Sequence, residues 1–212
     1  PHFIDHVPHS RHEQPQSIDK GPNQLSIAVA GDIDQKSDIF LLTDLARVLS
    51  DKNINVVFHV IGGGRWMPRL ETAAPLLTGS CSMQCHGRVD RSRYVGILSE
   101  CHAALVLPGR LNHFPIPVET SDYAAAGLAL FLTHDGELAD MVLKAHAGVL
   151  TDSLPEELAA ALGPLATDPQ QIARFRQASR KLAETFLDRE KLAAKAVVWL
   201  ESLAELAPVN PV

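Results

Sequence analysis

The sequence predicts an α/β fold built on a doubly wound parallel sheet of about six strands, in the spatial order 3-2-1-4-5-6 and with helices packed after the sheet. Three observations support this prediction. Short apolar runs alternate with amphipathic helical patterns, the runs are apolar on both faces, and glycine or proline follows most of them. Apolar residues make up 46% of the chain and aromatic residues 5%, which is typical of an α/β domain.

The first half of the chain contains three of the expected strands. The first, LSIAVA, ends at Gly31, and the helix after it carries an apolar stripe that includes Leu42, Leu45 and Leu49. The second strand, NVVFHVI, stops in three consecutive glycines. The expected elements are a strand at 25–30, a helix at 35–51, a strand at 55–61, a helical stretch at 67–77 and a strand at 82–86.

The second half continues the alternation. A helix with apolar residues that include Tyr94 and Leu98 leads into the buried strand AALVL, and Gly127 stops a further short helix. The expected elements are a helix at 92–101, a strand at 103–107, the helix that ends before Gly127, a strand at 128–133, a helix at 136–145 and a strand at 147–150.

Three helices close the chain. Ser153 and Glu156 form a capping-box pattern with Pro155 inside the first turn, which predicts the start of the first helix. Asp168-Pro169 predicts the start of the second. The apolar seams of the last two helices extend over only about two heptads, which favours packing helices over a coiled coil. The positions that form these seams are Ile172, Phe175, Ser179, Leu182 and Phe186, then Leu192, Ala196, Trp199, Leu203 and Leu206.

The residues that end the strands are expected to meet. Right-handed crossovers place the carboxyl ends of all strands at one edge of such a sheet, and ligands of these folds bind there. The residues that reach this edge are Gly31, Gly62–Gly64, Gly87, Pro108-Gly109 and Thr133.

Composition and motifs argue against several classes of function. The 19 basic and 25 acidic residues leave a net charge of −6, so a nucleic-acid partner is not expected. No apolar run reaches the roughly 18–20 residues that span a bilayer, and the polar first segment is no signal peptide. The chain lacks a dinucleotide fingerprint, a G-K-S/T phosphate loop and a supported Ser-His-Asp arrangement. Cys81, Cys85 and Cys101 are expected to be free thiols in a reducing cytoplasm, and no metal site is expected.

Four short motifs follow one another between residues 87 and 127. They are Gly87-Arg88-Val89, Leu107-Pro108-Gly109, Phe114-Pro115-Ile116-Pro117 and Asp122-Tyr123-Ala124-Ala125-Ala126-Gly127. In order and spacing these motifs resemble the C-terminal, nucleotide-sugar-binding half of GT-B glycosyltransferases, especially the large retaining group. The resemblance implies a linker at 1–24 and a Rossmann-like donor-binding domain at 25–212, cut from the C-terminal half of a longer protein. It also implies an N-terminal domain, missing here, that the final helix would contact through Trp199 and Leu203.

The resemblance further implies which residues contact the donor. Asp122, by its register with Gly127, takes the place of a ribose-binding glutamate and is one methylene shorter, and Glu119 lies on the same helix face. The helix that begins near Pro117 would point its free N–H groups at the diphosphate. The other expected contacts are Gly31, Lys36, Arg88, Val89, His113, Phe114 and Pro115. No cofactor is expected, because the nucleotide sugar is the donor substrate, and no catalytic residue is assigned.

Two positions depart from the family's pattern. The family's arginine after the glycine turn is Asp32 here, whose charge repels a diphosphate unless the side chain turns away; Arg88 or Arg65 could supply the cation instead. The family's acidic donor-loop residue falls on Phe114. These departures keep a second interpretation open, a non-catalytic Rossmann-like binding or interaction module that is a degenerate transferase half. A nucleotide-sugar epimerase of the same architecture is a third.

Under the first interpretation, the full enzyme transfers a sugar from a nucleoside diphosphate sugar to a glycan or small-molecule acceptor, as in polysaccharide biosynthesis. Helix N–H groups and a cation would stabilise the leaving diphosphate. The isolated domain is expected to be inactive. Its expected partners are the nucleotide sugar, the acceptor and its own N-terminal domain, and its expected location is cytoplasmic, with the full-length protein at the inner face of the membrane.

Overall fold

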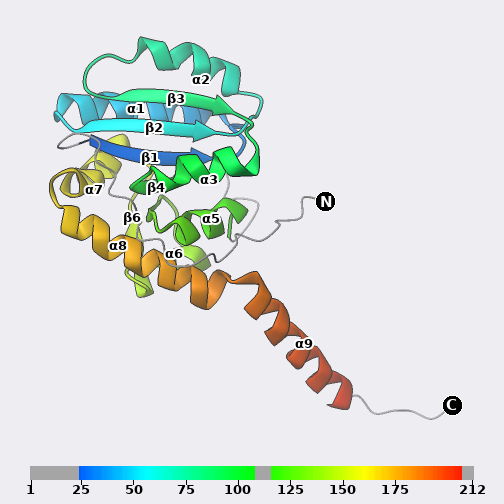
Figure 1. The fold of residues 1–212 in the computed structure, drawn as a ribbon. Helices are drawn as coiled ribbons and strands as arrows, with labels where there is room; N and C mark the ends of the chain where they lie inside the picture. The colour runs from blue at the N-terminus through cyan, green and yellow to red at the C-terminus, as the bar shows by residue number, and fades with distance from the viewer. Residues whose placement is uncertain (1–23, 108–115, 207–212) are drawn as a thin grey trace.

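A computed structural model describes residues 24–107 and 116–206 of the chain. Its six strands form one sheet in the order β3-β2-β1-β4-β5-β6, with every neighbouring pair parallel (Figure 1). The predicted α/β class and the predicted strand order are both confirmed. The expected linker at 1–24 lies outside the described residues except for Gln24, which begins the first strand.

The strands and helices follow the predicted ranges closely. The strands are β1 (Gln24–Ala30), β2 (Asn55–Ile61), β3 (Ser82–Gly87), β4 (Ala103–Val106), β5 (Ala129–Leu132) and β6 (Gly148–Leu150). The α-helices are α1 (Lys36–Asp51), α2 (Met67–Ala73), α3 (Arg91–Ser99), α5 (Val118–Ala126), α6 (Glu137–Lys144), α7 (Pro155–Thr167), α8 (Pro169–Leu182) and α9 (Arg189–Leu206). A 3-10 turn, η1 (Ala74–Leu76), follows α2, and a π-helical turn, η2 (Ala183–Leu187), follows α8.

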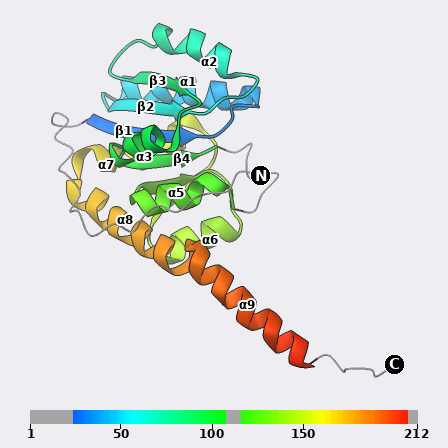
Figure 2. The same ribbon diagram turned by 45° about the vertical axis from the view of Figure 1, so that its right-hand side comes forward.

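Helices cover both faces of the sheet (Figure 2). Alternate residues of a strand face opposite sides, so Leu25, Ile27 and Val29 of β1 pack with α1, α2 and α7 in one core. Ala28 and Ala30 pack with α3, α5 and α6 in the other. Both sets are buried, which is why the strands read as continuous apolar runs rather than as an alternation of apolar and polar residues.

Helix α8 closes the amino-terminal edge of the sheet. Its Ser179 hydroxyl donates to the carbonyls of Leu128 (2.7 Å) and Ala147 (3.1 Å), which immediately precede β5 and β6. Arg176 donates to the carbonyl of Cys101, two residues before β4, at 2.9 Å. Burial and the neighbouring charge of Arg180 lower the pKa of Arg176. With this edge held by α8, a ligand site belongs at the opposite, carboxyl edge.

The start of α7 differs from the prediction. Leu154 holds the N-cap position without a side-chain cap, and Pro155 is the first helical residue. Ser153 instead donates its hydroxyl to the Thr133 carbonyl at 3.3 Å, across to the end of β5. The capping box expected from Ser153 and Glu156 is therefore wrong, because a contact from outside the helix competes for the serine.

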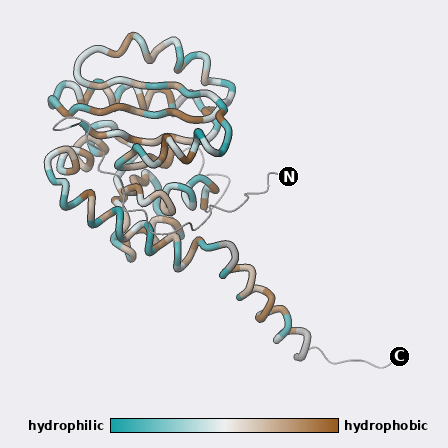
Figure 3. The backbone as a smooth tube through the Cα atoms, viewed as in Figure 1, coloured by the Kyte–Doolittle hydropathy of each residue, from teal (hydrophilic) through white to brown (hydrophobic). Residues whose placement is uncertain are grey.

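The last helix extends away from the sheet (Figure 1). Trp199 is 61% exposed and Leu203 42% exposed, and hydrophobic residues colour the middle turns of α9 in Figure 3. In the described part of the chain, α7 and α8 pack against the domain, whereas α9 presents its apolar side chains to solvent.

Candidate functional site at the carboxyl edge of the sheet

The loops that follow β1 and β2 are joined through their backbones. β1 and β2 end at the same register position, with Ala30 opposite Ile61. The loops that follow them therefore start side by side, at Gly31 and Gly62. The Gly31 N–H donates to the Ile61 carbonyl at 2.7 Å. Gly62 has a φ of +143°, and a Cβ there would lie 2.1 Å from the Gly31 carbonyl oxygen. Only glycine fits at this position, which explains one of the three consecutive glycines.

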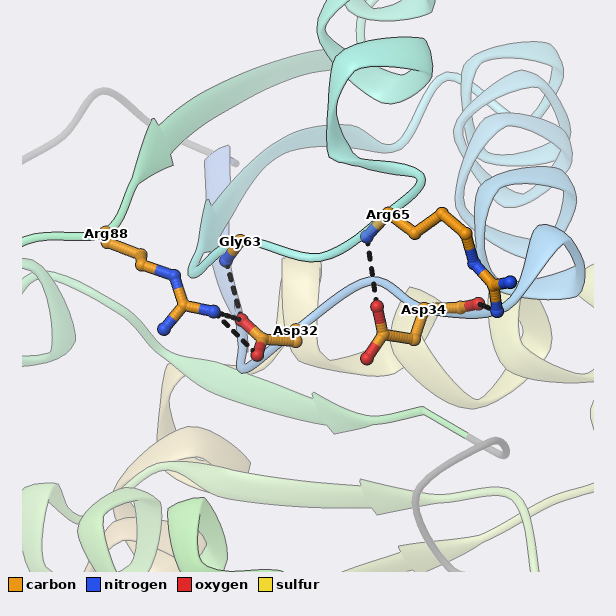
Figure 4. Close-up of polar contacts among 5 residues, drawn as sticks. All are labelled: Asp32, Asp34, Gly63, Arg65 and Arg88. Carbon is orange, nitrogen blue, oxygen red and sulfur yellow. Dashed lines mark hydrogen bonds and ion pairs between the residues drawn. The ribbon is translucent and has the colours of Figure 1, made fainter. Parts of the chain in front are cut away.

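Asp32 lies at the centre of these loops (Figure 4). Its carboxylate accepts the Gly63 N–H at 3.0 Å. It also accepts two hydrogen bonds from Arg88 Nη2, each 2.8 Å long. One side chain thus joins the loop after β1 to the loop after β2 and to the residue that follows β3.

Asp34 makes a parallel set of contacts on the other side of the same loop (Figure 4). Its carboxylate accepts the Arg65 N–H at 3.0 Å. The Arg65 guanidinium donates to the Asp34 main-chain carbonyl at 3.2 Å. Of the two arginines expected as possible cations, Arg88 therefore contacts Asp32, and Arg65 contacts Asp34.

Helix α5 starts at the same edge because it follows β4, and Tyr123 fixes its position. The Tyr123 hydroxyl accepts the N–H of Ala30, the last residue of β1, and the ring is fully buried. Pro117 occupies the N-cap without a side-chain cap, and Gly127 ends the helix with a φ of +75°. The first-turn N–H groups of a helix lack intrahelical partners, so this end of α5 favours an anion.

Asp122 of α5 is held by α3. Arg91 donates to both carboxylate oxygens, at 2.8 and 3.0 Å, and the Arg91 guanidinium lies 5.5 Å from the centre of the Tyr94 ring. The hydrogen bond to Asp122 raises the pKa of Arg91. Burial, followed by the charges of Asp122 and Glu119, raises the pKa of Tyr94 well above its ordinary value. The Asp122 side chain is only 15% exposed.

A histidine pair lies just before Gly87. His59 Nδ1 and His86 Nε2 are 3.1 Å apart, and the two rings are stacked with centroids 5.3 Å apart. Burial and the charge of Arg93 lower the pKa of His86, whereas Glu100 opposes this shift. The pair joins β2 to β3 at the residue that leads into the edge.

The expected donor contacts fall into two groups. Gly31 and Arg88 meet in the loop cluster around Asp32, and Glu119 and Asp122 lie on α5 beside Tyr94. Val89 is partly buried and packs against the second core. Lys36 is the first residue of α1, and its side chain lies outside what the structure describes. His113, Phe114, Pro115 and the Pro108-Gly109 turn also lie outside the described residues.

Sequence reasoning did not find Arg91 and Tyr94 as partners of Asp122, or Tyr123 as the anchor of α5. The spacing of Arg91 and Tyr94, three apart on one helix, was a usable signal that they share a face. Among the described residues, no group of three or more histidine, cysteine or acidic side chains is placed to hold a metal ion. In the same residues, no helix combines the length and apolarity that a membrane span requires.

The sequence matches the family described as glycosyl transferases group 1 over residues 10–182. No curated protein gives a match.

Solved structures with the same fold are numerous. The catalytic domain of cholesterol-α-glucosyltransferase from Helicobacter pylori aligns with a TM-score of 0.61 at 15% identity, over 78% of this chain and 99% of that one. Sucrose-phosphate synthase from Thermosynechococcus elongatus gives a TM-score of 0.69 at 16% identity, over 90% of this chain and 48% of that one. The C-terminal domain of a group 1 family glycosyl transferase from Francisella tularensis gives 0.62 at 15% identity, over 78% and 87%. This chain thus spans about half of the full synthase.

Proposed function

Because this chain belongs to the group 1 glycosyl transferases, we propose that it is the donor-binding domain of an enzyme that uses a nucleoside diphosphate sugar. The full enzyme transfers the sugar to a glycan or small-molecule acceptor. The acceptor side of the reaction belongs to an N-terminal domain outside this chain, so the chain alone turns over little or no substrate. The full-length protein works in the cytoplasm, at the inner face of the membrane, in polysaccharide biosynthesis.

The observation that carries this proposal is the placement of Asp122. Its carboxylate is mostly buried, lies on α5 at the ligand edge, and is oriented by two hydrogen bonds from Arg91. A carboxylate has about four lone-pair sites. Arg91 takes two of them, and a hydrogen bond with the Tyr94 side chain takes a third, so one site remains for a ribose hydroxyl.

The diphosphate belongs between the loop cluster and the start of α5. The cluster offers the Arg88 guanidinium beside the Gly31 turn. Helix α5 offers its first-turn N–H groups, which have no partner within the helix, and the positive end of its dipole. Lys36, at the start of α1, is a further proposed contact of the donor, as are His113, Phe114 and Pro115. Catalysis by these groups is electrostatic: they stabilise the charge that develops on the leaving diphosphate, and no cofactor is required.

A thermal-shift screen of the chain with UDP, GDP, ADP and CMP tests the proposal. A ligand that binds only the native state raises the free energy of unfolding by about 2.7 kcal/mol at a hundredfold excess over Kd. We expect one nucleoside diphosphate to raise the melting temperature by several degrees.

Asp122→Asn tests the ribose contact. The neutral amide keeps the shape of the side chain and loses the charge, so we expect calorimetric binding of that nucleotide to weaken by about 1–3 kcal/mol. Asp51→Asn is the matched control, because Asp51 is exposed at the far end of α1, away from the ligand edge. Equal affinity of the parent and both variants would show that Asp122 does not bind the ribose.

A second candidate function is a non-catalytic binding or interaction module. The observation that favours it is Asp32, an acidic residue in ion-pair contact with Arg88 where a diphosphate is expected. If none of the four nucleotides stabilises the chain at millimolar concentration, this second function replaces the first.

A further inference from the structure

Gly63 and Arg88 supply hydrogen-bond donors that would suit an anionic ligand. In this structure the anion that they bind is the carboxylate of Asp32. A backbone N–H at the end of a strand and a guanidinium group are the usual donors to a phosphate oxygen. Here both donate to the Asp32 carboxylate, over 2.8–3.0 Å (Figure 4).

The glycine allows Arg88 to take this position. A Cβ on Gly63 would lie 2.7 Å from Arg88 Nε. Arg88 therefore lies directly against the backbone of the loop, and any larger residue at 63 would displace it.

We propose that Asp32 is an internal anion that occupies part of the diphosphate subsite, and that the donor diphosphate must take Arg88 and the Gly63 N–H from it. This inference rests on the proposed function and concerns the regulation of the same site. Side chains that are 73% exposed (Arg88) and 41% exposed (Asp32) form a weak pair in water. A diphosphate carries more charge and more acceptor atoms than a carboxylate, so it can displace Asp32. The cost of that displacement lowers the affinity for the donor.

Asp34 provides a matched comparison within the same loop. Its carboxylate also accepts a backbone N–H. It also contacts an arginine, but that arginine is Arg65 and the contact is made by the main-chain carbonyl of Asp34. A neutral residue at position 34 therefore changes the charge of the loop by the same amount without releasing Arg88.

The test is isothermal titration with sodium pyrophosphate, and with the nucleoside diphosphate that gives the largest thermal shift. Asp32→Asn keeps an oxygen that can accept the Gly63 N–H and removes the charge that holds Arg88. We expect it to bind pyrophosphate roughly tenfold more tightly than the parent, the factor that one charge-assisted hydrogen bond contributes. Asp34→Asn should bind like the parent. Asp32→Ser provides a second uncharged variant if Asp32→Asn has a lowered melting temperature.

A double-mutant cycle distinguishes competition for Arg88 from a general effect of removing one negative charge. If Asp32 competes for Arg88, Arg88→Met weakens pyrophosphate binding more in the Asp32→Asn background than in the parent. Equal effects of Arg88→Met in both backgrounds would overturn the inference.

The remaining outcomes separate this inference from the proposed function. Parent binding of a nucleoside diphosphate with no gain in Asp32→Asn overturns the internal anion and leaves the donor-binding function intact. The internal-anion inference is also overturned if the parent binds pyrophosphate more tightly only when Mg²⁺ is present, because Asp32 would then recruit a cation. Absence of binding by the parent and by all variants overturns both.

Discussion

Asp122 is held by a helix other than its own, and this contact contributes to stability as well as to the proposed ribose site. Arg91 is 42% exposed and Asp122 is 15% exposed, so the pair is shielded from solvent on the carboxylate side. Ion pairs with such shielding are costly to break from one side, because the remaining charge loses its partner while it stays mostly buried.

Arg91→Met is therefore expected to lower the free energy of unfolding by about 1–2 kcal/mol, as the Asp122 charge loses both hydrogen bonds. Arg47→Met is the control. Arg47 and Asp44 also form an ion pair, at 2.6 Å, but their side chains are 69% and 44% exposed. Exposed pairs contribute at most about 0.5–1 kcal/mol, so this variant should lose less. Urea denaturation monitored by circular dichroism measures both values, and equal losses would contradict the shielding argument.

The helices of this domain begin in two different ways. Asp168 caps α8 with its own side chain, which accepts the N–H groups of Gln170 (2.9 Å) and Gln171 (3.1 Å). Ser153, two residues before α7, donates to the Thr133 carbonyl instead. Both positions match a cap pattern in the sequence, and only the first is used as a cap.

Asp168→Ala should therefore destabilise the domain by about 1 kcal/mol, the usual contribution of an N-cap side chain. Ser153→Ala removes one neutral hydrogen bond from a half-buried site and should cost roughly half as much. Thermal denaturation of the two variants, with Gln171→Ala as a control inside α8, gives the comparison. A larger loss for Ser153→Ala would mean that its bond to the end of β5 is more important than the cap.

At the scale of the whole molecule, the last two long helices contribute differently. Helix α8 buries Leu182 and Ser179 against the sheet. Helix α9 leaves large apolar side chains exposed, among them Val198 (66%) and Leu200 (57%). An exposed apolar face of this kind adds nothing to the stability of the domain that carries it.

A chain truncated after Leu187 should accordingly keep the melting temperature of the parent within about 2 °C, less than the shift that 1 kcal/mol produces in a domain of this size. A chain truncated after Thr167 loses α8 as well and should unfold without a cooperative transition. Differential scanning calorimetry of both truncations checks this. A fall of many degrees for the shorter deletion would show that α9 contacts the domain in solution.

The sequence by itself determined the α/β class and the six strands, because both follow from local patterns, and the strand order was predicted as a common one for this fold class. Continuous apolar runs such as β2 indicate the strands, and the stripe of α1 indicates a helix. Right-handed crossovers place the strand ends at one edge, and the order 3-2-1-4-5-6 is the usual one for two mononucleotide-binding halves. The end of α5 at Gly127 and the cap at Asp168 could also be predicted from the sequence, because both residues act on their close neighbours in the chain.

Only the tertiary structure decided how the ligand edge is built. Arg91 and Asp122 are 31 residues apart, and Arg88 and Asp32 are 56 apart. Contacts of this kind depend on how two loops or two helices meet, and no local propensity encodes them. The same holds for Ser153, which had a local cap available and took a partner 20 residues away. Local patterns decide where strands and helices form, whereas the pairing of charges at their ends depends on distances that exist only after the sheet is assembled.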